Sequence, residues 1–195
     1  MVETSCSERV DASKRDTKAS LYTIGHSNRP IEEFLSLLKA NRIEKLIDVR
    51  TVPKSRHNPQ FNADALSASL KKKGIAYERI EALGGFRKAR RDSQNTGWRN
   101  LSFRGYADYM ERPEFAEALK RLEKGAAKAR MVIMCAEAVP WRCHRSLIAD
   151  ALTVEGWEVR DIMSETKTRL HTLTPFISVK EGKLSYPSRT AILPW

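Results

Sequence analysis

The segment Met134–Arg145 contains two cysteines, Cys135 and Cys143, close to a histidine and two arginines. Cysteine can act as a nucleophile, and a helix start with nearby arginines attracts anions and lowers the pKa of a thiol. The segment therefore predicts an anion-binding site that uses a thiol, with Cys143 favoured over Cys135. The alternative is that both cysteines are small core residues. The candidate catalytic residues here are Cys135, Glu137, Cys143 and His144, and the candidate anion-binding residues are Arg142 and Arg145.

The same segment raises the question of a metal. Thiolate and imidazole ligands suit zinc. However, the spacing between Cys135 and Cys143 does not match the paired short spacings of structural zinc sites. We therefore predict no cofactor, and a metal at Cys135, Cys143 and His144 is the less favoured alternative.

Polar side chains also follow other predicted strands. Glycine at position 25 lets a ligand approach the backbone, and His26 comes directly after it. Asp48 and Arg50 lie two residues apart and so share one face of a strand, where a carboxylate can orient a histidine or act as a base. The alternatives are a tight turn whose Ser27 or Asn28 caps a helix, and a structural Asp–Arg pair. These segments add His26 and Asp48 as candidate catalytic residues, and Gly25, Ser27, Asn28, Arg50, Ser55, Tyr77, Gly84 and Gly85 as candidate anion-binding residues.

A basic segment runs from Leu83 to Arg104. Its net charge of +5 is nearly half of the +11 carried by the whole chain. Arginines interleaved with aromatic side chains are typical of single-stranded nucleic-acid binding. The alternative is a solvated loop whose aromatic side chains pack onto the domain. The candidate nucleic-acid contacts are Arg87, Lys88, Arg90, Arg91, Trp98, Arg99 and Arg104.

The elements that would position these residues alternate between strands and helices. Apolar runs predict five strands, over residues 21–24, 45–49, 75–80, 130–135 and 157–162. Between them we expect a helix starting near Pro30, one capped by Asn62 and ending at Lys73, one around residues 115–122, and one opening at residues 141–145. Residues 83–104 are expected to be a loop. This alternation predicts an α/β domain with a mostly parallel sheet of about five strands, flanked by helices.

The parallel sheet predicts where the site lies. Ligands of parallel sheets bind beyond the carboxyl ends of the strands, so the candidate residues should converge on one edge.

We assign residues 21–163 to the domain and residues 1–20 to a disordered polar tail. Residues 164–195 form an extension that packs on the domain, with a hairpin predicted around Glu181-Gly182.

Composition limits the classes of function. The chain has 195 residues, 41% hydrophobic and 30% charged, and no apolar run long enough to span a bilayer. Three cysteines do not form a disulfide framework, and no secretory signal is evident, so we expect a cytoplasmic protein without a membrane partner. The +11 charge favours an anionic small molecule or nucleic acid as partner.

Several motifs together resemble those of the domain-of-unknown-function 488 family. They are Thr23-Ile-Gly-His-Ser-Asn28, Asp48-Val-Arg50 with Pro53 and Ser55, Leu83-Gly-Gly85, Met134-Cys-Ala-Glu137 and Cys143-His-Arg145. The resemblance extends from about Leu21 to Ile162 and implies a bacterial or archaeal α/β protein of uncharacterised activity. A weaker similarity links Leu46–Arg50 and the strand ending in Cys135 to rhodanese-type sulfurtransferases, in which the loop after the cysteine cradles an anion.

Three functional hypotheses follow. The first is an enzyme whose anion site binds a phosphate-bearing or nucleic-acid substrate at the carboxyl edge of the sheet, with a thiol taking part. The second is a nucleic-acid or nucleotide-binding module without catalysis. The third is sulfur transfer of the rhodanese type, with a persulfide on Cys135. The sequence predicts no oligomeric state.

Overall fold

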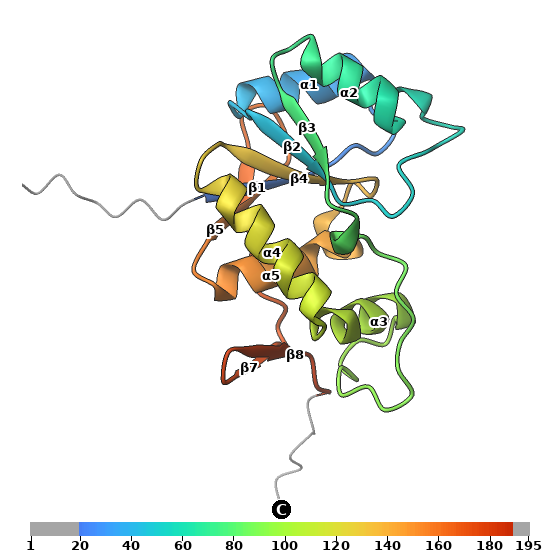
Figure 1. Ribbon diagram of the computed structural model, residues 1–195, viewed down its shortest axis with the longest axis vertical. Helices are drawn as coiled ribbons and strands as arrows, with labels where there is room; N and C mark the ends of the chain where they lie inside the picture. Colours follow the sequence, from blue (N-terminus) through green and yellow to red (C-terminus); the bar gives the residue numbers. More distant parts are fainter. Residues whose placement is uncertain (1–19, 189–195) are drawn as a thin grey trace, which may run out of the picture.

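The computed structural model describes residues 20–188, in which six strands form the main sheet (Figure 1). They are β1 (Ser20–Gly25), β2 (Lys45–Asp48), β3 (Ala76–Arg79), β4 (Met131–Cys135), β5 (Glu158–Ile162) and β6 (Thr168–Leu170). Their order is β3-β2-β4-β1-β5-β6, and only the edge strand β6 pairs antiparallel. The prediction of a mostly parallel α/β sheet is confirmed, with β6 added to the five expected strands.

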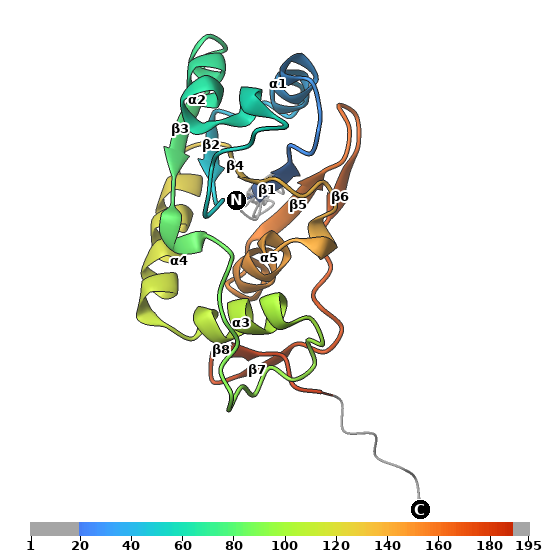
Figure 2. The same ribbon diagram turned by 90° about the vertical axis from the view of Figure 1, so that its right-hand side faces the viewer.

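Helices cover both faces of this sheet. They are α1 (Ile31–Ala40), α2 (Ala63–Lys71), α3 (Leu101–Met110), α4 (Pro113–Ala126) and α5 (Arg145–Val154). Helices α1 and α2 lie on one side, whereas α4 and α5 lie on the other with α3 beyond them (Figures 1 and 2). Neighbouring residues on a strand belong to opposite cores: Val132 packs with the α1 and α2 leucines, and Ile133 with those of α4 and α5. Burial on both faces explains why β4 is apolar throughout.

The C-terminal hairpin is also confirmed. Strands β7 (Ser178–Lys180) and β8 (Lys183–Ser185) pair antiparallel across Glu181 and Gly182, whose φ values are 49° and 75°. Two consecutive positive φ values are typical of a tight hairpin turn. The hairpin lies near α3 (Figure 2), and Tyr186 after it is 1% exposed. The predicted tail, residues 1–20, lies outside the described residues except for Ser20.

Two elements were not predicted. Helix α3 begins inside the segment predicted as a loop, and its buried face is short, with Tyr106 and Ala107 as its buried apolar residues. A side chain at Gly105 would lie 2.2 Å from the Arg87 carbonyl oxygen, so a residue that normally disfavours helices is needed here for close packing. Strand β6 is three residues long and largely exposed, so it has no apolar pattern.

The helices start close to where they were predicted, but their predicted side-chain caps and the predicted end of one helix were wrong. Helix α1 begins after Pro30 without a side-chain cap, so Ser27 and Asn28 do not cap it. Helix α2 ends at Lys71 rather than Lys73, and the Asn62 side chain accepts a hydrogen bond from the Ser55 N–H at 2.7 Å instead of capping. A 3-10 turn (Pro140–Arg142) precedes α5, which starts only at residue 145. None of the helices within residues 20–188 has the length and apolar character needed to cross a membrane.

Candidate functional site

A pocket of about 750 Å³ lies where the segments that follow β1, β2 and β4 meet. The loop after β3 and helix α3 close its other side. Of the predicted site residues, it is lined by His26, Ser27, Asn28, Arg50, Ser55, Gly85, Cys135, Glu137, Arg142, Cys143 and His144. Residues far apart in the sequence therefore share one cavity because parallel strands end at the same edge.

The floor of the pocket contains Cys135, Cys143 and His144. The His144 Nδ1 atom lies 3.8 Å from the Cys143 sulfur and 4.0 Å from the Cys135 sulfur. The other ring nitrogen, Nε2, lies 3.1 Å from the Val49 carbonyl oxygen, which can only accept a hydrogen bond. Nε2 therefore donates, and Nδ1 faces both sulfurs.

The two thiols have opposite tendencies to ionise. A hydrogen bond from Cys143 outweighs burial and, together with His144 and Arg145, lowers the pKa of Cys135 to about 3. The same hydrogen bond and burial raise the pKa of Cys143 well above its ordinary value. These opposite directions favour Cys135 as the thiol that ionises, with Cys143 as the neutral neighbour. The predicted preference for Cys143 as the reactive thiol stays a prediction.

Arg145 is a buried cation close to these sulfurs. Its side chain is 1% exposed and donates from Nη2 to the Ala138 carbonyl oxygen, while Nε and Nη1 lack partners within residues 20–188. It does not line the pocket, although it was predicted to bind an anion there. Instead it supplies positive charge next to Cys135 and Cys143.

One wall of the pocket is formed by Arg50, which Asp48 holds in place. The Arg50 Nε and Nη2 atoms donate to the Asp48 carboxylate at 2.9 and 2.5 Å, and the Arg50 backbone N–H adds a third bond at 3.0 Å. Tyr77 donates its hydroxyl to the same carboxylate at 2.8 Å. Asp48 is fully buried and outside the pocket, so its geometry suits positioning Arg50 better than proton transfer.

His26 completes this wall as a neutral ring. Its Nδ1–H donates to the Ser27 carbonyl oxygen at 2.7 Å, so Nε2 carries the lone pair and faces Arg50 Nη1 at 3.3 Å. Burial and the neighbouring Arg50 charge outweigh the Ser27 hydrogen bond and lower the pKa of His26. The ring stacks on Phe61 with centroids 4.2 Å apart. These contacts make His26 a fixed acceptor for Arg50.

Two glycines permit close approaches around the site. A side chain at Gly25 would lie 1.9 Å from the Glu137 carbonyl oxygen, so glycine lets the segment after β4 cross the end of β1. A side chain at Gly85 would come 3.0 Å from His144 Nδ1. Gly84 instead packs against Thr51 and does not line the pocket.

Part of the backbone around Cys143 is already hydrogen-bonded. The Arg142 and Cys143 N–H groups donate to the Val139 and Pro140 carbonyl oxygens at 3.1 and 3.0 Å. In the first turn of α5, the Ser146 and Leu147 N–H groups are also bonded within the turn. These four N–H groups are therefore not free to bind an anion.

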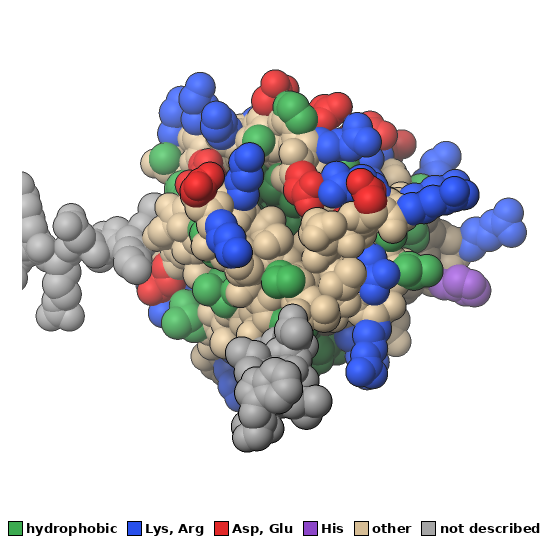
Figure 3. All heavy atoms as spheres, turned by 90° about the horizontal axis from the view of Figure 1, so that it is seen from below, with side chains coloured by type: hydrophobic (Ala, Val, Ile, Leu, Met, Phe, Trp, Pro, Cys, Tyr) green, Lys and Arg blue, Asp and Glu red, His purple; other side chains and the backbone are tan. Residues whose placement is uncertain are grey.

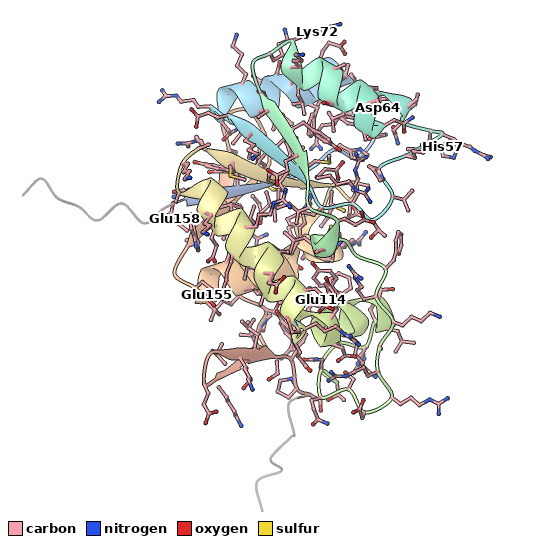
Figure 4. The ribbon with its side chains drawn as sticks, in the orientation of Figure 1. His57, Asp64, Lys72, Glu114, Glu155 and Glu158 are labelled. Atoms are coloured by element: carbon pink, nitrogen blue, oxygen red, sulfur yellow. The ribbon has the colours of Figure 1, made fainter. Side chains whose placement is uncertain are left out.

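The mouth of the pocket combines apolar and basic side chains. Phe86 is 85% exposed with a φ of 56°, and Val52 is 58% exposed. Lys54 and Arg142 also line the pocket. His57, from the same loop as Lys54, points away from the molecule (Figure 4). Figure 3 shows Lys and Arg side chains beside a histidine at one side of the surface.

The predicted nucleic-acid loop is largely occupied by internal contacts. Arg87 lies 3.7 Å above the Tyr109 ring, and Arg90 pairs with Glu111 at 2.7 Å. Arg104 Nε donates to the Trp98 carbonyl oxygen at 3.0 Å. The Trp98 ring packs in an aromatic cluster with Phe103, Phe176 and Tyr186. Lys88, Arg91 and Arg99 remain on the surface, so nucleic-acid binding by this loop stays a prediction.

Sequence reasoning missed several lining residues. They include Thr51, Val52, Ser102 and Tyr106. Tyr106 belongs to the unpredicted helix α3, and its ring lies 4.9 Å from that of His144. The rule that ligands bind beyond the carboxyl ends of parallel strands points to residues that follow strands. It could not predict a pocket wall that a helix contributes.

Comparison with protein families gives one match. The model of a domain of unknown function, DUF488, matches residues 30–152. The chain belongs to the DUF488 family. The matched region includes Arg50, Cys135, Cys143 and His144 but not His26. No curated protein and no solved structure matches the chain.

Proposed function

We propose that this DUF488 protein is an enzyme that hydrolyses or transfers a phosphoryl group in the pocket. In this proposal Arg50, Lys54 and Arg142 bind the phosphate, and the floor formed by Cys135, Cys143 and His144 supplies the reacting group. The observation that carries the proposal is the buried Arg50, fixed by Asp48 on a wall beside that floor.

Arg50 is suited to anion binding because its orientation is already set. Guanidinium groups have five N–H donors that match phosphate oxygens. Asp48 engages one edge of the group, and Nη1 has His26 as its side-chain contact within residues 20–188, so Nη1 retains an N–H for a ligand. A cation held before binding loses little side-chain freedom when the substrate arrives.

The size and mouth of the pocket support a substrate larger than phosphate alone. A volume of about 750 Å³ is typical of small-molecule sites. Phe86 and Val52 expose apolar surface at the mouth, whereas Ser55 and Asn58 add polar groups. A mononucleotide or another phosphate ester with an aromatic group fits this distribution.

Binding is tested by calorimetric titration of the full chain with inorganic phosphate, pyrophosphate and AMP. Lys54→Ala and Arg142→Ala should each weaken the tightest of these by about fivefold, since an exposed charge-assisted hydrogen bond contributes about 1 kcal/mol. Arg56→Ala is the matched control, because Arg56 is an exposed cation of the same loop that does not line the pocket. Equal effects of all three substitutions would indicate bulk charge attraction and contradict the proposal.

Catalysis is tested with p-nitrophenyl phosphate and bis(p-nitrophenyl) phosphate as probes. We expect nitrophenolate release by the wild-type chain, loss of release in Cys135→Ser, and unchanged release in Cys6→Ser. Release of neither probe, or equal release by Cys135→Ser, would overturn the catalytic part of the proposal.

A further inference from the structure

We propose that Cys135, Cys143 and His144 together bind one Zn²⁺ ion whose fourth coordination position opens into the pocket. Their ligand atoms all lie within 4.8 Å of one another. Within residues 20–188, they form a group of three His, Cys, Asp or Glu side chains close enough to share one metal ion. This deepens the proposed function and rests on it, because the floor that supplies the reacting group would do so as a metal site, whereas phosphate binding rests on the wall and is tested separately.

The distances are close to those of a zinc site. Zn–S bonds of about 2.3 Å and Zn–N bonds of about 2.0–2.1 Å at a tetrahedral angle separate sulfur from nitrogen by about 3.6 Å. The His144 Nδ1 atom lies 3.8 and 4.0 Å from the two sulfurs. A contraction of a few tenths of an ångström would therefore bring His144 Nδ1 to the nitrogen–sulfur separation of a zinc site from both sulfurs.

The orientation of His144 supports ligation independently of these distances. Its Nε2–H is engaged by the Val49 carbonyl oxygen at 3.1 Å, which directs the Nδ1 lone pair toward Cys135 and Cys143. Metal-bound histidines usually donate their other ring N–H to such a backbone or carboxylate oxygen. Tyr106 and Gly85 pack against the same ring and restrict its rotation.

The ligand set also distinguishes the kind of zinc site. Two thiolates neutralise a divalent cation, and sulfur and nitrogen ligands select zinc over magnesium or calcium. The three ligands all line the pocket, which leaves a position for water or a substrate oxygen. Three protein ligands with an open fourth position are typical of catalytic rather than structural zinc. Buried Arg145, with two unpartnered nitrogens, lies close enough to interact electrostatically with both sulfurs.

The test uses the full chain after removal of metal with a chelator. Titration with Zn²⁺ against a chromophoric competitor should show one tight site. Titration with Co²⁺ should give a thiolate-to-cobalt charge-transfer band and the intense visible absorption of four-coordinate cobalt. Cys135→Ser, Cys143→Ser and His144→Ala should each reduce Zn²⁺ affinity by more than about 100-fold, because loss of outer-shell partners alone costs 10- to 100-fold.

Matched controls are Cys6→Ser and His57→Ala, a third cysteine and an exposed histidine, which should bind Zn²⁺ like the wild type. Because the cysteine variants could unfold, the wild-type cobalt spectrum is decisive alone: absence of the charge-transfer band overturns the inference. If AMP still binds through Lys54 and Arg142 in that case, only the metal inference fails. If Zn²⁺ binds as expected but AMP and pyrophosphate do not, only the proposed function fails.

Discussion

Replacing Asp48 by asparagine should destabilise the protein strongly. Asp48 is fully buried and compensates the charge of Arg50, which is 5% exposed. It accepts hydrogen bonds from three donor groups of Arg50 and from the Tyr77 hydroxyl. Breaking a buried ion pair by removing one partner costs about 3–5 kcal/mol, because the remaining charge is left uncompensated. Against a typical total stability of about 5–15 kcal/mol, this is a large fraction.

The comparison variant for this prediction is Tyr77→Phe. It removes a single hydrogen bond to the same carboxylate from a half-buried side chain, so a loss of about 1.5 kcal/mol is expected. Urea unfolding at pH 7, followed by tryptophan fluorescence, gives both free energies of unfolding. A loss below about 1 kcal/mol for Asp48→Asn would refute the view that this carboxylate holds Arg50 in place, since it would lie far below the cost expected for a buried pair.

Three further substitutions test other parts of the structure. Gly25→Ala should lower the urea midpoint markedly, because its side chain would collide with the Glu137 carbonyl oxygen; an unchanged midpoint would contradict the close crossing there. Asp108 has a lowered pKa, since hydrogen bonds to its carboxylate outweigh burial, so its contribution is present above its unfolded pKa of about 4 and lost as the pH falls further. Stability should therefore fall less between pH 5 and pH 3, by a pH-unfolding series, in Asp108→Asn than in the exposed control Asp64→Asn. Phe86→Gly should preserve stability, since it relieves a positive φ, yet weaken AMP more than inorganic phosphate in calorimetry; equal weakening would exclude a stacking role.

The parallel sheet could be predicted because its central strands, β1, β2 and β4, are buried on both faces. Strand β4 is buried throughout, so its apolar run is continuous, and it places Cys135 at the carboxyl edge. Helix α3 could not be predicted in this way, because its short buried face includes Gly105 and its amino end is set by an Asn100 side chain that accepts from Ser102. Polar capping by asparagine also occurs in loops, so the signal is ambiguous.

The candidate site was predicted better in place than in chemistry. The rule for parallel sheets brings His26, Arg50 and Cys135 to one edge, as the structure has them. The grouping of Cys143 with Cys135 depends on the 3-10 turn at Pro140, which brings the chain back over seven residues. Motif spacing describes short, regular ligand loops, so it argued against a metal at Cys135, Cys143 and His144, although an irregular loop brings these residues together.

A crystal structure of the full chain grown with pyrophosphate tests the central claim most directly. The proposed function predicts a pyrophosphate oxygen within hydrogen-bonding distance of Arg50 Nη1 and a second contact from Lys54 or Arg142, with the ligand facing Cys135. An empty pocket with pyrophosphate bound instead at the surface cations of the Leu83–Arg104 segment would contradict it.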